Sequence, residues 1–186
     1  MGLLIGKVIE EFKVGDRVIK IRYPKFEDIE DLQKYINALV DENAYINRVR
    51  KVNRKEEIEF VSDLLKKIEN KKATALVVEA NGKVMGLAEI NKGLGGESHV
   101  GTLGIGLGRE IRALGLGKKL MQAVIEEAKK NLKIEIVRLE VFTKNKVARN
   151  LYKKFGFREV GFIKKGVKKG KQYYDVIIMV KNLLNI

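Results

Sequence analysis

The hexapeptide Arg-Ala-Leu-Gly-Leu-Gly at residues 112–117 decides how this chain folds. An apolar segment ending at Leu107 precedes it, and a segment with Leu116, Leu120 and Val124 on one helical face follows it. A strand, a glycine-bearing turn and a helix start together form a cradle for a phosphate group. Glycine lets the backbone approach an anion closely, and the helix start adds about half a positive charge. The pattern is neither a Walker loop nor a dinucleotide-binding turn, and alone it is equally typical of a turn that serves only packing.

A second block lies about thirty residues further on, at residues 139–157, and reads Leu-Glu-Val-Phe-Thr-Lys-Asn-Lys-Val-Ala-Arg-Asn-Leu-Tyr-Lys-Lys-Phe-Gly-Phe. Together the two blocks resemble the signature motifs of the GNAT superfamily of acyl-CoA-dependent N-acetyltransferases. The closest resemblance is to the subgroup that acetylates ribosomal proteins, other protein N-termini or amino acids. It covers about residues 19–183. It implies transfer of an acetyl group from acetyl-CoA to a primary amine by direct attack in a ternary complex.

The hydrophobic pattern predicts an α+β fold in which strands and helices do not strictly alternate. The resemblance implies a three-layer αβα sandwich around a mixed, mostly antiparallel sheet. A hairpin signal stands at Asn81-Gly82. The expected strands lie near 18–21, 75–79, 83–90, 99–107, 134–142, 157–163 and 173–180, and the expected helices near 27–40, 58–68, 116–128 and 147–154. About the first fifteen residues fall outside the resemblance, and we assign them no role.

Composition limits the classes of protein that this chain can represent. Its 186 residues with 45% hydrophobic content suit one domain over residues 1–186. It has no apolar run of about 18 residues and no signal-peptide pattern at its start, so we expect a cytoplasmic protein. It has no cysteine and one histidine, His99, which excludes thiolate and multi-histidine metal sites. We therefore expect chemistry that uses no metal.

The net charge of +14 comes from 38 Lys and Arg against 24 Asp and Glu. Such a chain attracts polyanions, but a surface rich in lysine and glutamate is also typical of heat-adapted proteins. We therefore expect an anionic cofactor or an acidic protein partner rather than nucleic acid as the main partner. A basic nucleic-acid-binding protein and an acyl-CoA-binding module without turnover remain the competing hypotheses.

The resemblance implies that two segments and one asparagine bind acetyl-CoA. The backbone of residues 105–107 would pair with the pantetheine arm as an added strand does, and residues 112–118 would hold the pyrophosphate. Lys118 and Lys119 lie where a 3′-phosphate could attract them, although lysines at a helix start are often merely solvated. Asn145 would contact the arm near the thioester and also cap the next helix. The predicted cofactor-binding residues are Ile105, Gly106, Leu107, Arg112, Ala113, Leu114, Gly115, Leu116, Gly117, Lys118 and Asn145.

Tyr152 matches the family tyrosine that protonates the departing thiolate. A phenol with a pKa near 10 stays protonated at neutral pH and can donate this proton. The alternative is a buried aromatic side chain with its hydroxyl at the surface. Leu151, Phe155 and Phe157 are expected in the core.

The general base is Glu140 by resemblance, because a glutamate in a Leu-Glu-Val segment twelve residues before the tyrosine plays this part in the ribosomal-protein subgroup. Glu140 could take the amine proton through water if its face of the strand borders the cleft; otherwise it is a solvated charge. Residues 98–108 contain no carboxylate. Glu89 is a weaker alternative, and His99 is another because it titrates near neutrality.

Acceptor pKa values mildly favour an α-amine. Neutralising a lysine ammonium at pH 7 costs about 4.6 kcal/mol, whereas neutralising an N-terminal amine costs about 1.4 kcal/mol. We therefore expect a peptide or protein N-terminus or an amino acid as the acceptor, with lysine and small amines left open. A homodimer is also left open. The last hairpin carries a lysine-rich turn that is either merely solvated or receives an acidic peptide, with Lys164, Lys165, Lys168, Lys169 and Lys171.

Overall fold

The structure, a computed structural model, describes residues 4–184. Its strands are β1 (Val8–Val14), β2 (Arg17–Arg22), β3 (Ala73–Ala80), β4 (Lys83–Lys92), β5 (Val100–Leu107), β6 (Ile136–Phe142), β7 (Arg158–Lys169) and β8 (Gln172–Asn182). Its α-helices are α1 (Ile29–Asp41), α2 (Arg54–Glu69), α3 (Leu116–Leu132) and α4 (Lys146–Lys154). Short 3-10 helices lie at Phe26–Asp28, Gly95–Glu97 and Arg109–Ile111. None of the described helices combines the length and apolar character needed to cross a bilayer.

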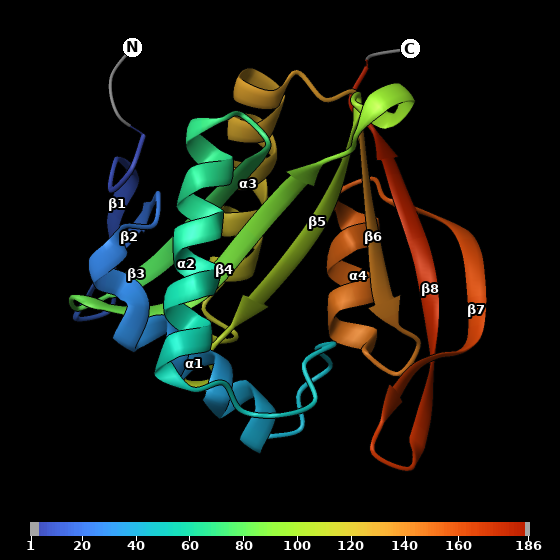
Figure 1. Ribbon diagram of the computed structural model, residues 1–186, viewed down its shortest axis with the longest axis horizontal. Coiled ribbons are helices and arrows are strands. Elements are labelled where there is room, and N and C mark those ends of the chain that lie inside the picture. The colour runs from blue at the N-terminus through green and yellow to red at the C-terminus, as the bar shows by residue number, and fades with distance from the viewer. Residues whose placement is uncertain (1–3, 185–186) are drawn as a thin grey trace.

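One sheet contains all eight strands, in the order β1-β2-β3-β4-β5-β6-β8-β7 (Figure 1). Every neighbouring pair is antiparallel except β5 and β6, which run parallel. The connection from β5 to β6 contains α3, as a parallel crossover requires. This arrangement confirms the predicted α+β fold with a mixed, mostly antiparallel sheet.

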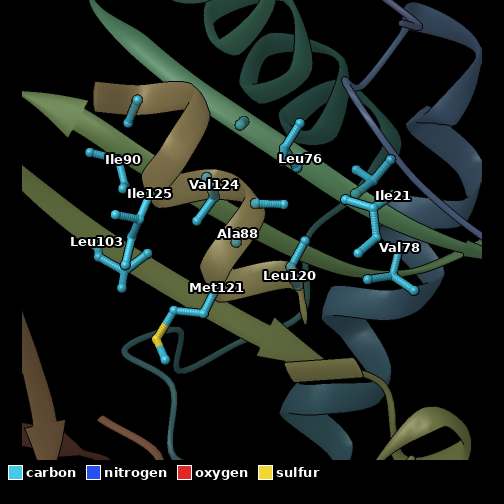
Figure 2. Packing of buried hydrophobic residues seen from close by; sticks show 14 of the residues in the cluster. Ile21, Leu76, Val78, Ala88, Ile90, Leu103, Leu120, Met121, Val124 and Ile125 are labelled. Atoms are coloured by element: carbon cyan, nitrogen blue, oxygen red, sulfur yellow. The ribbon is translucent and has the colours of Figure 1, made fainter. Parts of the chain in front are cut away.

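Helices cover both faces of the sheet. On one face α3 packs across β3, β4 and β5, where its buried Leu120, Met121 and Val124 meet Leu76 and other apolar side chains of the strands (Figure 2). On the other face α1 packs against β4 and α2 against β3, so all but one residue of β3 are buried. The molecule therefore has three layers, because β3 and its neighbours have apolar side chains on both faces and each face needs a cover of helices.

Local capping signals explain where helices begin. Asn53 accepts the N–H of Glu56, and the Glu56 carboxylate accepts the N–H of Asn53 in return, which closes a capping box at the start of α2. In α1 the Asp31 carboxylate accepts the N–H of Val84 at 3.0 Å and so ties the helix to β4. The contact between Asp31 and Val84 thus holds α1 against β4, a strand that borders the main cavity described below.

The N-terminal strand was missed by the sequence analysis, which begins the fold with a single strand. In the structure β1 forms a hairpin with β2 across Gly15, whose φ is +59°. Charged and apolar residues are mixed on β1 and none of its residues is fully buried, so no alternation marks it. Residues 8–14 therefore add an eighth strand at one edge of the sheet.

The last hairpin is longer than predicted. The segment 164–169, expected to be part of a lysine-rich turn, belongs to β7, and only residues 170–171 form the turn. An irregularity between Ile163 and Val167 interrupts the pairing with β8, and the Asp175 carboxylate accepts the N–H of Lys165 there at 2.7 Å. Lysine is rare in strand interiors but common on exposed edges, and β7 is an edge strand. The prediction ended the strand too early for this reason.

Candidate active site

Strands β5 and β6 separate after three paired residues. Residues 100–102 pair with 136–138, and no further pair joins the two strands in the described chain. β5 nevertheless continues to Leu107 and stays paired with β4 along its other edge. The side of residues 103–107 that faces β6 is therefore open to an added strand of amides. The open edge includes the residues predicted to bind the cofactor arm, Ile105, Gly106 and Leu107.

A cavity of about 1100 Å³ lies where the strands separate, and we call it the main cavity. Its walls come from α1, the loop at residues 45–50, β4, β5, β6 and α4, and one residue each comes from α2 and β8. The structure thus brings together side chains from segments far apart in the sequence. The predicted site residues on its lining are Ile105, Gly106, Glu140, Asn145 and Tyr152.

The turn before α3 presents a row of main-chain donors. The N–H groups of residues 113–117 donate to no protein acceptor in the described chain, whereas those of Lys118 and Lys119 donate to the carbonyl of Gly115 at 3.1 and 3.4 Å. Ala113 and Gly115 have positive φ angles of 62° and 75°, a conformation that occurs in anion-binding nests. Residues 112–115 are exposed. Five N–H groups without a protein acceptor in the described chain therefore lie at the positive end of a 17-residue helix, and three of them belong to exposed residues.

The side chain of Arg112 joins this turn to two other elements. Its Nε donates to the carbonyl of Leu107 at 2.9 Å, and its guanidinium forms an ion pair with Glu42 at the end of α1. The side chain of Arg112 is thus engaged within the protein, and the cradle consists of main-chain groups.

The two lysines that follow the turn differ in their surroundings. Lys119 forms an ion pair with Glu10, and its ammonium lies 4.3 Å from the centre of the Phe12 ring. Both partners belong to β1, the strand that the sequence analysis missed. Lys118 is exposed in the first turn of α3. Of the two lysines suggested for a 3′-phosphate, β1 therefore engages only Lys119.

Helix α4 carries Asn145 and Tyr152 to the cavity. The Asn145 side-chain oxygen accepts the N–H of Ala148 at 3.2 Å, which confirms its predicted capping role and leaves its amide N–H groups for another partner. Tyr152 is 7% exposed and packs against Phe157 at 5.9 Å between ring centres. Burial raises the pKa of Tyr152 to about 12. Its phenol is therefore protonated throughout the neutral range.

Two carboxylates border the gap beside Gly104. Glu89 of β4 lies opposite Gly104, and a Cβ atom placed on that glycine would lie 3.8 Å from the Glu89 carboxylate oxygen. Thr102 pairs with Arg138, so Glu140, two residues after Arg138, stands at the level of Gly104 on the far side of the gap. Both glutamates line the main cavity. Burial raises the pKa of Glu89, whereas Glu140 is exposed.

The remaining candidate for the general base, His99, lies elsewhere. His99 precedes β5 and is absent from the lining of the main cavity, and its carbonyl accepts the N–H groups of Glu135 and Ile136. Arg138 lines the cavity and donates to the Thr102 hydroxyl at 3.1 Å. Among residues 4–184 no three His, Asp or Glu side chains are grouped as metal ligands would be.

Two tyrosines of the site were not identified from the sequence. Tyr35 of α1 lies over Gly106, and burial raises its pKa. Its spacing from Leu32 and Leu39, three and four residues away, is a helical signal that could have placed it on the buried face. Tyr45 lies in the loop after α1, 5.5 Å from Phe142 between ring centres. A loop residue has no periodicity, so no signal marks Tyr45.

The model of the acetyltransferase (GNAT) family matches residues 36–157. The matched region includes α1 from Ile36 onward, the open edge of β5, the turn before α3 and the whole of α4.

Two curated relatives and one solved structure agree with this match. An N-alpha-acetyltransferase of Sulfurisphaera tokodaii is 33% identical over 111 residues, covering 55% of this chain and 66% of the relative. An L-amino acid N-acetyltransferase of Escherichia coli is 32% identical over 84 residues, covering 45% of this chain and 52% of the relative. The matched regions thus span less than two thirds of both relatives. The structure of a ribosomal-protein-alanine N-acetyltransferase from Brucella melitensis superposes with a TM-score of 0.78 at 25% identity, covering 88% of this chain and 99% of that one.

Proposed function

Because this chain belongs to the GNAT family of acetyltransferases, we propose that it transfers the acetyl group of acetyl-CoA to a primary amine, by direct attack of the amine in a ternary complex. The observation that carries the proposal is the row of five unpaired N–H groups at residues 113–117, next to the open edge of β5. A diphosphate fits the row, and an amide-bearing arm fits the edge. The open edge of β5 borders the main cavity.

The cofactor is positioned by main-chain groups. The N–H groups of 113–117 bind the pyrophosphate, since a helix start and a nest both favour an anion. The arm then runs along residues 105–107, satisfying their open N–H and C=O groups. The Asn145 amide donates to a carbonyl of the arm near the thioester. This course brings the acetyl group into the main cavity beside Tyr152.

Acetyl transfer needs a neutral amine and a protonated leaving group. The amine nitrogen attacks the thioester carbonyl carbon, the carbon–sulfur bond breaks, and coenzyme A departs as a thiolate. Tyr152 donates its phenolic proton to that sulfur. Its raised pKa keeps the phenol protonated at every physiological pH, so the proton is available to the developing thiolate.

The base belongs to the pair Glu89 and Glu140. Glu140, at the exposed side of the gap, attracts the ammonium form of the acceptor. Glu89 removes the proton, directly or through a water molecule, because burial raises its pKa and makes it the stronger base. This differs from the sequence interpretation, in which Glu140 is the preferred base and Glu89 a weaker alternative.

We further propose an α-amine, of a peptide or protein N-terminus or of an amino acid, as the acceptor. Two carboxylates are a modest base, and an α-amine costs about 3 kcal/mol less to neutralise than a lysine. The relatives named for N-alpha and L-amino acid acetylation support this choice.

An acetylation screen tests the proposal. Peptides with free N-termini, N-terminally blocked lysine peptides and free amino acids are each incubated with acetyl-CoA, and release of free thiol is measured. Turnover on α-amines supports the proposal, and turnover only on internal lysines contradicts the acceptor class. Tight acetyl-CoA binding without turnover on any amine would indicate a binding module. Sub-micromolar nucleic-acid binding that acetyl-CoA does not affect would indicate a different function.

A further inference from the structure

A second cavity, which we call the side pocket, opens beside the main cavity at the tip of the β7–β8 hairpin. It has a volume of about 470 Å³ and is lined by Asn43, Tyr45, Lys144, Lys169 and residues 172–174. Two of these residues are lysines and none is acidic. The lining therefore combines two positive charges with neutral hydrogen-bonding groups.

Tyr45 lines both cavities. Its ring packs on Phe142, which lines the main cavity two residues after Glu140. A chain that places its amine between Glu89 and Glu140 can therefore continue past Tyr45 into the side pocket. In an acceptor peptide, the residues that directly follow the N-terminal amine would reach the side pocket.

Lys169 is held at the edge of the side pocket. Its Nζ donates to the carbonyl of Ala44 at 2.6 Å and lies 5.4 Å from the centre of the Phe142 ring and 6.0 Å from that of Tyr174. An ammonium has three N–H donors, so one contact with Ala44 leaves donors for an anion. Burial lowers the pKa of Lys169 because it disfavours the charged ammonium. An anion beside the ammonium would offset this effect.

The surroundings of the side pocket are also positive. Lys165 and Lys168 lie 5.5 and 5.3 Å from the centre of the Tyr173 ring. Asp175 is the acidic residue of the hairpin tip, and its carboxylate already accepts the N–H of Lys165. The field at the side pocket therefore favours an anionic group from outside the protein.

We infer that the side pocket binds a carboxylate of the acceptor, so that the preferred acceptor is a peptide or protein N-terminus with Asp or Glu among its first few residues. This inference rests on the proposed function, because it takes the main cavity as the site of the amine. A nucleic acid is a poorer occupant. Base binding needs uncovered aromatic faces, and here ammonium groups already lie over the rings of Phe142, Tyr173 and Tyr174.

A peptide series tests the inference. Peptides that differ only by Glu or Gln at position 2, 3 or 4 are compared by kcat/KM at low ionic strength. We expect about a tenfold preference for Glu at one position, the size of a favourable charge contact at a partly buried site. The preference should shrink as salt is added.

Matched variants show whether the side pocket is the source of the preference. In the double variant Lys144→Gln/Lys169→Gln we expect the preference for Glu to fall to about twofold or less, because kcat/KM falls more for the Glu peptides than for the Gln peptides. Lys171→Gln is the control, since Lys171 lies in the turn of the same hairpin but does not line the pocket. It should retain the preference. Lys169→Arg, which keeps the charge, should retain most of it.

The outcomes separate this inference from the proposed function. Turnover on all peptides with equal kcat/KM for Glu and Gln overturns the inference and leaves the proposed function intact. Equal losses in Lys171→Gln and in the double variant also overturn it, because they show only the effect of net charge. Where turnover is absent, peptide affinity in the presence of acetyl-CoA decides: equal affinities for Glu and Gln peptides overturn the inference. Oligouridylate binding that the double variant abolishes, without a peptide preference, overturns it in favour of a polynucleotide.

Discussion

A Cβ atom on Gly106 would lie 2.4 Å from the hydroxyl oxygen of Tyr35. Gly106 belongs to the open edge of β5, and Tyr35 comes from α1 on the same face of the sheet. The helix can therefore rest on the strand only because residue 106 has no side chain. This contact fixes the edge on which we place the cofactor arm.

Gly106→Ala should destabilise the protein by about 1–3 kcal/mol, because overpacking forces Tyr35 or β5 to move. We also expect acetyl-CoA to bind about tenfold more weakly, since the edge shifts. Urea unfolding and calorimetric titration measure the two effects. Tyr35→Phe removes the clashing oxygen, so the double variant should recover part of both losses. Strictly additive effects in this cycle would show that the two residues do not interact.

Tyr152→Phe should lower kcat by about a hundredfold, since general acid catalysis contributes about that much or more. The affinity for acetyl-CoA should not change, because the ring is kept. Single-turnover kinetics and calorimetry separate the two quantities. With a pKa of about 12 for Tyr152, the rate of the wild type should show no loss from phenol ionisation below pH 10. Unchanged kcat in the variant would remove Tyr152 from the mechanism.

Glu89→Gln should lower activity and raise stability at pH 7. Burial raises the pKa of Glu89 in the folded state, so between the unfolded pKa, about 4.3, and the folded pKa the native state binds more protons than the unfolded state. Stability from this group then falls as the pH rises through that window. The free energy of unfolding of the variant should therefore exceed that of the wild type by more at pH 7 than at pH 4.

Glu140→Gln is the matched control for Glu89→Gln. Its side chain is exposed, so the substitution should leave the free energy of unfolding nearly unchanged at both pH values. We expect it to raise KM for the amine more than it lowers kcat, because Glu140 attracts the ammonium. If Glu140→Gln instead abolishes kcat while Glu89→Gln retains it, Glu140 is the base, as the sequence alone suggests.

Lys118→Gln should weaken coenzyme A binding about threefold to fivefold without affecting dephospho-coenzyme A, if its exposed ammonium meets the 3′-phosphate. Lys119→Gln should have a smaller effect, because Glu10 and Phe12 of β1 already engage that ammonium. Competition titrations with the two nucleotides measure the difference. Equal effects of both substitutions would mean that only net charge matters.

The fold could be predicted largely from local patterns. The turn at 112–117, the Asn81-Gly82 hairpin and the apolar faces of the helices are signals carried by neighbouring residues, and the structure confirms each element. Phe157 is buried as expected, with Leu151 and Phe155 packed against the core. The strand β1 could not be predicted, because it is short, none of its residues is fully buried, and an irregularity between Val8 and Glu10 interrupts its alternation.

The site was only half predictable. The turn, Asn145 and Tyr152 lie within two sequence motifs. The position of Glu89 relative to Glu140 depends on strand register, and only the register of β4, β5 and β6 places both carboxylates beside Gly104. Tyr45 and the side pocket arise from the packing of a loop on a distant hairpin. Such contacts are set by tertiary structure and leave no pattern along the chain.

The double attachment of Arg112 bears on the order in which substrates associate. Its guanidinium group joins the turn at residues 112–117 both to the end of β5 and to Glu42, from which the loop carrying Tyr45 departs. A ligand that orders the turn would therefore also order the loop that carries Tyr45, past which we propose that the amine enters. We therefore expect the nucleotide to associate first and the amine second, a compulsory sequence that product-inhibition patterns would reveal and that random-order patterns would contradict.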